Sequence, residues 1–137
     1  MLIAARRPFK AIIGIEYAGH LHEIAAANCQ TYRNLDQKCH SLLPIFGDVL
    51  NYPLPPGPII CFMCNPFDQK TLRAVFNNWR ERYRTGEQEI RIFYLNMRDI
   101  AESAKVLEEQ DWLIPVASDE RFVVLAPAER SNANRAR

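Results

Sequence analysis

Short runs of apolar, uncharged residues recur along this chain, and they constrain its fold more than any other feature. The clearest run covers residues 59–64, and a second covers residues 11–15, where β-branched side chains dominate. A strand that is apolar on both sides of its backbone is typical of a parallel sheet that is covered on both faces. The runs therefore predict a parallel α/β architecture.

Segments with helical periodicity separate the apolar runs. Apolar residues spaced three or four apart predict a helix over residues 19–33, and a second helix follows Asp68, which suits an N-cap. A third helix is expected over residues 100–110. Residues 1–7 are typical of the end of a helix that Pro8 terminates.

Further strands complete the alternation. Residues 41–46 and 90–95 predict two strands, while residues 112–116 and 122–125 predict an antiparallel hairpin around a short polar turn. This order favours a mostly parallel sheet with right-handed crossovers and helices on both faces. The hairpin would add one antiparallel strand at the sheet edge.

Length and composition favour one globular domain. The 137 residues are 48% hydrophobic and 24% charged, close to the averages of globular proteins. We expect a domain over residues 1–127 and a disordered tail over residues 128–137. The formal net charge of +1 creates no field that would attract nucleic acid, so a nucleic-acid partner has no support.

The sequence predicts a cytoplasmic protein without a membrane partner. No apolar run approaches the roughly 18 to 20 residues that span a bilayer. The first residues do not resemble a secretory signal, because their charges follow a very short apolar stretch. The four cysteines are therefore expected to be reduced.

The cysteines and histidines do not predict a metal site. Cys61 and Cys64 match a C-x-x-C pattern, but residues three apart in a strand point to opposite faces. His20 and His22 lie two apart at a helix start, on different faces, and are expected at the surface. We predict free thiols and no structural metal.

Acidic residues follow the first two predicted strands. Glu16 closes the first strand, and Asp48 follows the second after Gly47. Ligands of open α/β sheets bind outside the carboxyl ends of the strands, where a carboxylate can accept hydrogen bonds from ribose hydroxyls. A solvated loop charge and an ordinary Gly-Asp turn are the alternatives for these residues.

Taken together, the motifs resemble a class I S-adenosylmethionine-dependent methyltransferase from its second strand onward. The likeness rests on GIEY at residues 14–17, HEIAAAN at residues 22–28, GDVL at residues 47–50 and CNPF at residues 64–67. It covers about residues 1–126, and its specificity lies in the order and placement of short motifs. The resemblance implies a Rossmann-like sheet.

The resemblance also assigns cofactor-binding residues. Glu16 would bind the ribose hydroxyls of S-adenosylmethionine, and Tyr17, the next residue, is also assigned to the cofactor. Asp48 would bind the exocyclic amine of adenine, and Val49 would contact the adenine ring. We therefore predict that the carboxylates of Glu16 and Asp48 lie at the same carboxyl edge of one parallel sheet and face a common cleft.

The same resemblance places the methyl acceptor beside Asn65, Pro66 and Phe67, although Phe67 also suits the core under the next helix. The Asn-Pro-Phe step is one proline short of the Asn-Pro-Pro-Tyr signature of amino-group methyltransferases, so small-molecule and protein acceptors both stay open. The reaction would be an in-line displacement in which the protein aligns the reactants and excludes water. No catalytic residue is assigned.

The sequence lacks the glycine-rich cofactor loop of that family. Its five glycines form no G-x-G, and the first strand already ends with the ribose-binding acid. We expect a truncated domain that lacks this loop and the central strand between the strands ending at Glu16 and Asn65. Loss of this strand would leave a gap of roughly 9.5 Å between its two neighbours, with unpaired strand edges that favour an oligomer. We expect this chain to bind S-adenosylmethionine weakly or not at all. An extended form that contains the loop would bind it.

Two other functions stay open. A nicotinamide-nucleotide-binding Rossmann domain also places an acid after its second strand, but it does not require the later Asp48 and Asn65 motifs. A non-catalytic remnant or interaction domain is favoured by the missing loop. Methyl transfer to an unidentified acceptor is the first interpretation.

Overall fold

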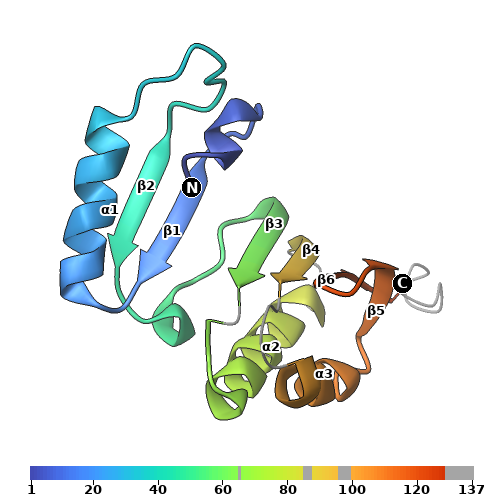
Figure 1. Ribbon diagram of the computed structural model, residues 1–137. Helices are drawn as coiled ribbons and strands as arrows, with labels where there is room; N and C mark the ends of the chain where they lie inside the picture. The colour runs from blue at the N-terminus through green and yellow to red at the C-terminus, as the bar shows by residue number, and fades with distance from the viewer. Residues whose placement is uncertain (65, 85–87, 96–99, 129–137) are drawn as a thin grey trace, which may run out of the picture. The chain divides into compact units, whose positions relative to one another are not determined.

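The computed structural model describes residues 1–64, 66–84, 88–95 and 100–128 (Figure 1). The chain forms two compact units, Met1–Pro53 and a second unit that begins at Leu54. The single domain expected over residues 1–127 stays a prediction. Of the expected tail, only Ala128 lies within the described residues, where its carbonyl accepts a hydrogen bond from the Tyr83 hydroxyl at 3.1 Å.

The first unit is a parallel strand pair whose strands are connected by one helix (Figure 1). Ile12 lies opposite Leu42 and Glu16 lies opposite Phe46, so the two strands begin and end at the same level. Pro44 of β2 lacks an amide donor, which is tolerated here because both strands of a two-stranded sheet are edge strands. The elements of this unit are the 3-10 turn η1 (Ala4–Arg6), β1 (Ile12–Glu16), α1 (Gly19–Thr31), β2 (Leu42–Phe46) and the 3-10 turn η2 (Val49–Asn51).

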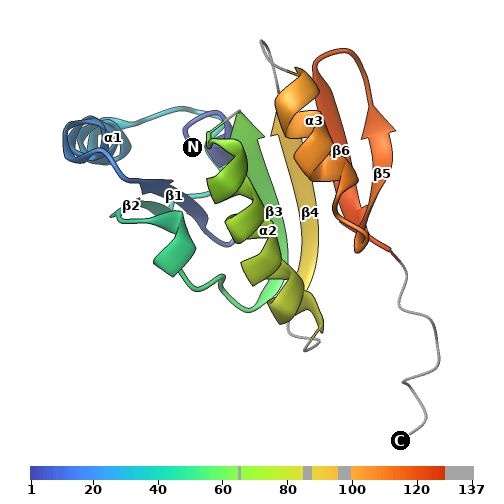
Figure 2. The same cartoon turned by 90° about the horizontal axis from the view of Figure 1, so that it is seen from below.

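The second unit contains a four-stranded mixed sheet in the order β3-β4-β6-β5 (Figure 2). β3 and β4 are parallel, whereas β6 is antiparallel to both of its neighbours. The antiparallel strand therefore lies inside the sheet, and the expectation of an antiparallel edge strand was wrong. Pro115 explains the edge position of β5, because a proline cannot donate to a ladder and is tolerated at sheet edges. The strands are β3 (Gly57–Cys64), β4 (Gln88–Leu95), β5 (Leu113–Ser118) and β6 (Phe122–Pro127).

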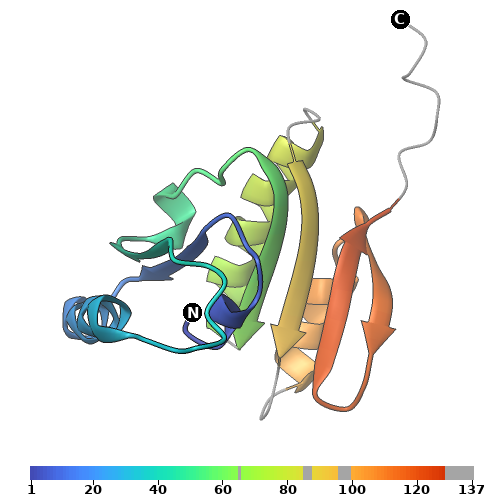
Figure 3. The same ribbon diagram turned by 90° about the horizontal axis from the view of Figure 1, so that it is seen from above.

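Helices α2 (Gln69–Arg84) and α3 (Ile100–Glu108) cover one face of this sheet (Figure 3). α2 connects β3 to β4, and α3 connects β4 to β5. Both connections step across the sheet in the same direction, so right-handed crossovers place both helices on the same face. The expected helices on both faces are therefore not found for this sheet. Within the described ranges, no helix is long and apolar enough to cross a bilayer.

The core of the second unit lies between these helices and the sheet. Leu72, Val75 and Phe76 of α2 are at most 1% exposed, and the Phe76 ring meets Trp79 edge-on with centroids 6.1 Å apart. The helix that carries them begins after Asp68, whose Oδ1 accepts a hydrogen bond from the amide of Thr71 at 2.7 Å. The facing residues of β4, equally buried, are Ile90, Ile92 and Tyr94.

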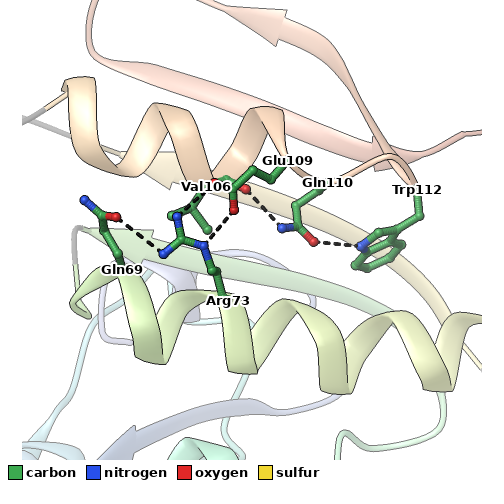
Figure 4. Close-up of polar contacts among 6 residues, drawn as sticks. All are labelled: Gln69, Arg73, Val106, Glu109, Gln110 and Trp112. Carbon is green, nitrogen blue, oxygen red and sulfur yellow. Dashed lines mark hydrogen bonds and ion pairs between the residues drawn. The ribbon is translucent and has the colours of Figure 1, made fainter.

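Polar contacts join α2 to the end of α3 (Figure 4). The Arg73 guanidinium donates through Nε and Nη2 to the two carboxylate oxygens of Glu109, at 2.7 and 2.8 Å. Gln110 is 8% exposed; its Nε2 donates to the Val106 carbonyl at 3.0 Å and its Oε1 accepts from Trp112 Nε1 at 3.2 Å. Both ends of this buried amide are therefore satisfied, and the amide anchors the indole ring beside the helix end.

The opposite face of the four-stranded sheet exposes large apolar side chains. Phe62 lies opposite Phe93 in the β3–β4 register, and the two side chains are 69% and 39% exposed. Ile60, on the same face, is 54% exposed. Among the described residues, β3 pairs only with β4, and it is not paired with β1. The two strands expected to flank the gap therefore belong to different sheets.

The bounds of the elements differ from the sequence expectation by a few residues. β3 begins at Gly57, two residues earlier than expected, where a φ of +92° favours glycine. α1 ends at Thr31, and the expected helix end before Pro8 is a single 3-10 turn. These differences lie at element ends, where capping and loop geometry decide the boundary.

Replacement of Phe76 by alanine tests the packing of the second unit. Phe76→Ala deletes a fully buried ring, so we expect the free energy of unfolding to fall by about 3 to 5 kcal/mol. Both tryptophans belong to the second unit, so urea unfolding followed by tryptophan fluorescence reports on this unit. Asn77→Ala, on the exposed side of α2, is the control and should change stability by less than about 0.5 kcal/mol. Equal effects of the two variants would contradict this packing.

Candidate functional site

Glu16 and Asp48 lie at the same end of the parallel strand pair in the first unit. Glu16 ends β1 opposite Phe46, which ends β2. The amide of Gly47 donates to the Glu16 carbonyl at 3.0 Å, so the loops that leave the two strands start side by side. The structure thus places both acids at one carboxyl edge of a parallel sheet, as predicted.

The Glu16 carboxylate is fixed by the start of the following helix. Its Oε1 accepts a hydrogen bond from the amide of Ala18 at 2.8 Å, directly before α1 begins at Gly19. A carboxylate at a helix N-terminus also interacts favourably with the helix dipole. The next residue, Tyr17, is 77% exposed. The first unit therefore presents an oriented carboxylate and an exposed aromatic ring at this edge.

Asp48 is oriented by the 3-10 turn that follows β2. Its Oδ1 accepts a hydrogen bond from the amide of Leu50 at 2.9 Å, and Val49 lies half-buried between them. Asp48 therefore has the local turn role that Gly-Asp sequences favour. A carboxylate offers about four acceptor positions, so this single bond leaves capacity for a ligand.

His22 belongs to the same end of the first unit, which the sequence reasoning missed. The residue is half-buried, and its ring centroid lies 5.7 Å from that of Phe46. Its Nδ1 is buried and has no hydrogen-bond partner among the described residues. His20 is exposed, as expected, whereas His22 is only partly exposed. The available signal was its position one turn into the helix, beside a strand that ends in an aromatic residue.

The residues assigned to the acceptor belong to the second unit. Asn65 lies outside the described residues. Pro66 is exposed and Phe67 is half-buried, directly after β3 and before the Asp68 cap of α2. Their placement at the carboxyl end of a parallel strand agrees with the sequence expectation, while their role stays a prediction.

A cavity of about 520 Å³ lies in the first unit, but at the other end of the strand pair. Its position follows from its lining, which includes Tyr32 after the last turn of α1 and Leu42 at the start of β2. The common cleft expected for Glu16 and Asp48 therefore stays a prediction.

The cysteines show the face alternation that the strand predicts. Cys61 is half-buried and lies beside Ile92 in the register, whereas Cys64 is exposed. Burial raises the pKa of the Cys61 thiol to about 12. All four cysteines, each within the described residues, are free thiols. In the same part of the chain, no group of three or more histidine, cysteine or acidic side chains is arranged to hold a metal ion.

Comparison of the chain with protein-family models, with curated proteins and with solved structures gives no match. The assignment of a function to this protein therefore depends on its own residues and their geometry.

Thiol labelling at pH 8 tests the contrast between Cys61 and Cys64. A thiol with a pKa of about 12 is ionised in only about one molecule in 10,000 at this pH, and only the thiolate reacts. We expect the aromatic disulfide reagent DTNB to modify Cys64 first and Cys61 much more slowly. Cys64→Ser should therefore remove the fast phase. Loss of the fast phase in Cys61→Ser instead would show that the strand faces are assigned the wrong way round.

Proposed function

We propose that the protein belongs to the S-adenosylmethionine-dependent methyltransferases and transfers a methyl group to an acceptor not yet identified. The observation that carries the proposal is the position of Glu16 and Asp48 at the carboxyl ends of two adjacent parallel strands. Ligands of open α/β sheets bind outside such strand ends. The adenosine part of the cofactor would bind at this edge of the first unit.

The chemistry of the four cofactor-side residues supports this proposal. The Glu16 carboxylate, oriented by the Ala18 amide, would accept charge-assisted hydrogen bonds from the ribose hydroxyls. Asp48, oriented by the Leu50 amide, would accept from the exocyclic amine of adenine. Exposed Tyr17 and half-buried Val49 would supply apolar contacts to the adenine ring.

The strand order of the second unit also supports the proposed architecture. Two parallel strands joined by a helix, followed by an inserted antiparallel strand, agree with a mostly parallel, Rossmann-like sheet that ends in a hairpin. A Rossmann-like fold hosts several functions, so the strand order supports only the architecture, whereas the acid edge supports the choice of cofactor.

The proposed reaction requires alignment of reactants more than a catalytic group on the protein. The sulfonium supplies the reactive methyl group, and the protein would orient the acceptor and exclude water. Pro66 and Phe67, with Asn65, are the residues proposed to face the acceptor. No residue is assigned as a catalytic acid or base.

A titration followed by ¹⁵N–¹H NMR tests the role of Glu16. S-adenosylmethionine should shift the amides of residues 16–18 and 48–50, with an affinity weaker than micromolar because the sequence contains no G-x-G to approach the amino-acid portion of the cofactor. Glu16→Gln should weaken binding at least about tenfold, because it removes the charge from the hydrogen bonds to ribose.

Two controls separate the proposal from its alternatives. Glu23→Gln removes an exposed carboxylate from α1 in the same unit and should leave the affinity unchanged. NADH should bind more weakly than S-adenosylmethionine. Tighter binding of NADH, or identical binding by Glu16→Gln and the unaltered protein, would refute the proposed cofactor.

A further inference from the structure

A cavity of about 410 Å³ lies in the second unit between α3 and the β5–β6 hairpin. Its volume falls within the range of roughly 300 to 1,000 Å³ that is usual for small-molecule sites. None of the residues assigned to the cofactor or to the methyl acceptor lines it. The cavity is therefore not part of the proposed cofactor or acceptor site.

The wall of this cavity is mainly apolar and follows the strands. Pro115 and Leu125 are partners in the β5–β6 register, and Leu113 and Ser118 mark the two ends of β5. Five steps of about 3.3 Å separate those ends, so the wall extends over roughly 16 Å. The cavity therefore suits an elongated ligand body. Its other apolar lining residues are Ala104, Leu107, Phe122 and Val123.

The buried polar groups of the cavity are satisfied within the protein. The Tyr94 hydroxyl donates to Ser103 Oγ at 2.9 Å, and these residues are 1% and 6% exposed. Gln110 bonds to the Val106 carbonyl and to Trp112. Apolar contact would therefore dominate the interaction with the ligand body, and the rim would decide which polar head is accepted.

The rim of the cavity is acidic at both of its ends. Its charged lining residues are Glu108 at the end of α3 and, in the hairpin turn, Asp119, Glu120 and Arg121. The Asp119 carboxylate lies 3.6 Å from Arg121 Nη2 and accepts hydrogen bonds from the amides of Arg121 and Phe122. These two opposite charges largely offset each other, so Glu120 sets the sign at the turn end of the rim, and Glu108 sets it at the other end, near the start of β5.

We propose that this cavity binds an organic cation with an elongated apolar body, such as an alkylammonium. The alkyl chain would lie along the wall formed by α3, β5 and β6, and the ammonium group would remain at the rim beside Glu108 or Glu120. An anion with the same chain would place its head group beside one of these carboxylates and be repelled, and a neutral alcohol would gain only the apolar contact.

Three probes with the same chain test this proposal on the full 137-residue protein. Hexylammonium, hexan-1-ol and hexanoate are titrated separately at low ionic strength, and amide shifts are followed at Leu107, Gln110 and Val123. We expect hexylammonium to bind at least about tenfold more tightly than hexanoate, with hexan-1-ol between them. Added salt should reduce the difference, because the rim is exposed to solvent.

Variants of exposed residues identify the source of the preference without disturbing the core. Glu108→Gln combined with Glu120→Gln should weaken hexylammonium about tenfold and leave hexan-1-ol unchanged. Glu89→Gln removes a carboxylate from the other face of the sheet and should change neither affinity. Equal binding of the cation and the anion, shifts confined to other amides, no shift up to about 10 mM, or an unchanged preference in the double variant would each overturn the proposal.

Discussion

The parallel pairing of β1 with β2 in one register is the constraint on which the proposed cofactor site depends. The pairing ends both strands at the same level, opposite each other at Glu16 and Phe46. A slip of one residue would turn every side chain of one strand to the other face and would displace Asp48 from Glu16. The two carboxylates are thus positioned by backbone hydrogen bonds rather than by contact with each other.

The second unit depends on a different constraint, the order of strands in its sheet. The short turn between β5 and β6 makes these strands neighbours, and Pro115 keeps β5 at the edge. β6 then pairs with β4, and α3 passes over them. This arrangement places the end of α3, with Glu108, and the hairpin turn, with Glu120, along one cavity. The acidic residues at the two ends of the cavity are therefore a consequence of topology, since these two glutamates are twelve positions apart in the sequence.

The sequence predicted the features that depend on local signals. Apolar runs identified the strands, Asp68 marked the start of α2, and Glu16 and Asp48 marked the strand ends. The inner position of β6 was not predicted, because it depends on which edge of β4 is free after β3 has paired. The contact between His22 and Phe46 was missed for a similar reason, since it joins a helix to a strand that follows it in the chain. The cavity beside α3 depends on the placement of a helix relative to an edge strand, which no local pattern reports.

Intermolecular nuclear Overhauser effects between bound S-adenosylmethionine and the protein provide the most direct test of the central claim, that the edge formed by Glu16 and Asp48 holds the adenosine part of the cofactor. Val49 carries methyl groups and Tyr17 carries ring protons at this edge, so both can be assigned and observed. The account predicts contacts from the adenine protons to the Val49 methyl groups and from the ribose protons to residues 16 and 17. Contacts confined to residues at the other end of the strand pair, such as Tyr32 and Leu42, would contradict it.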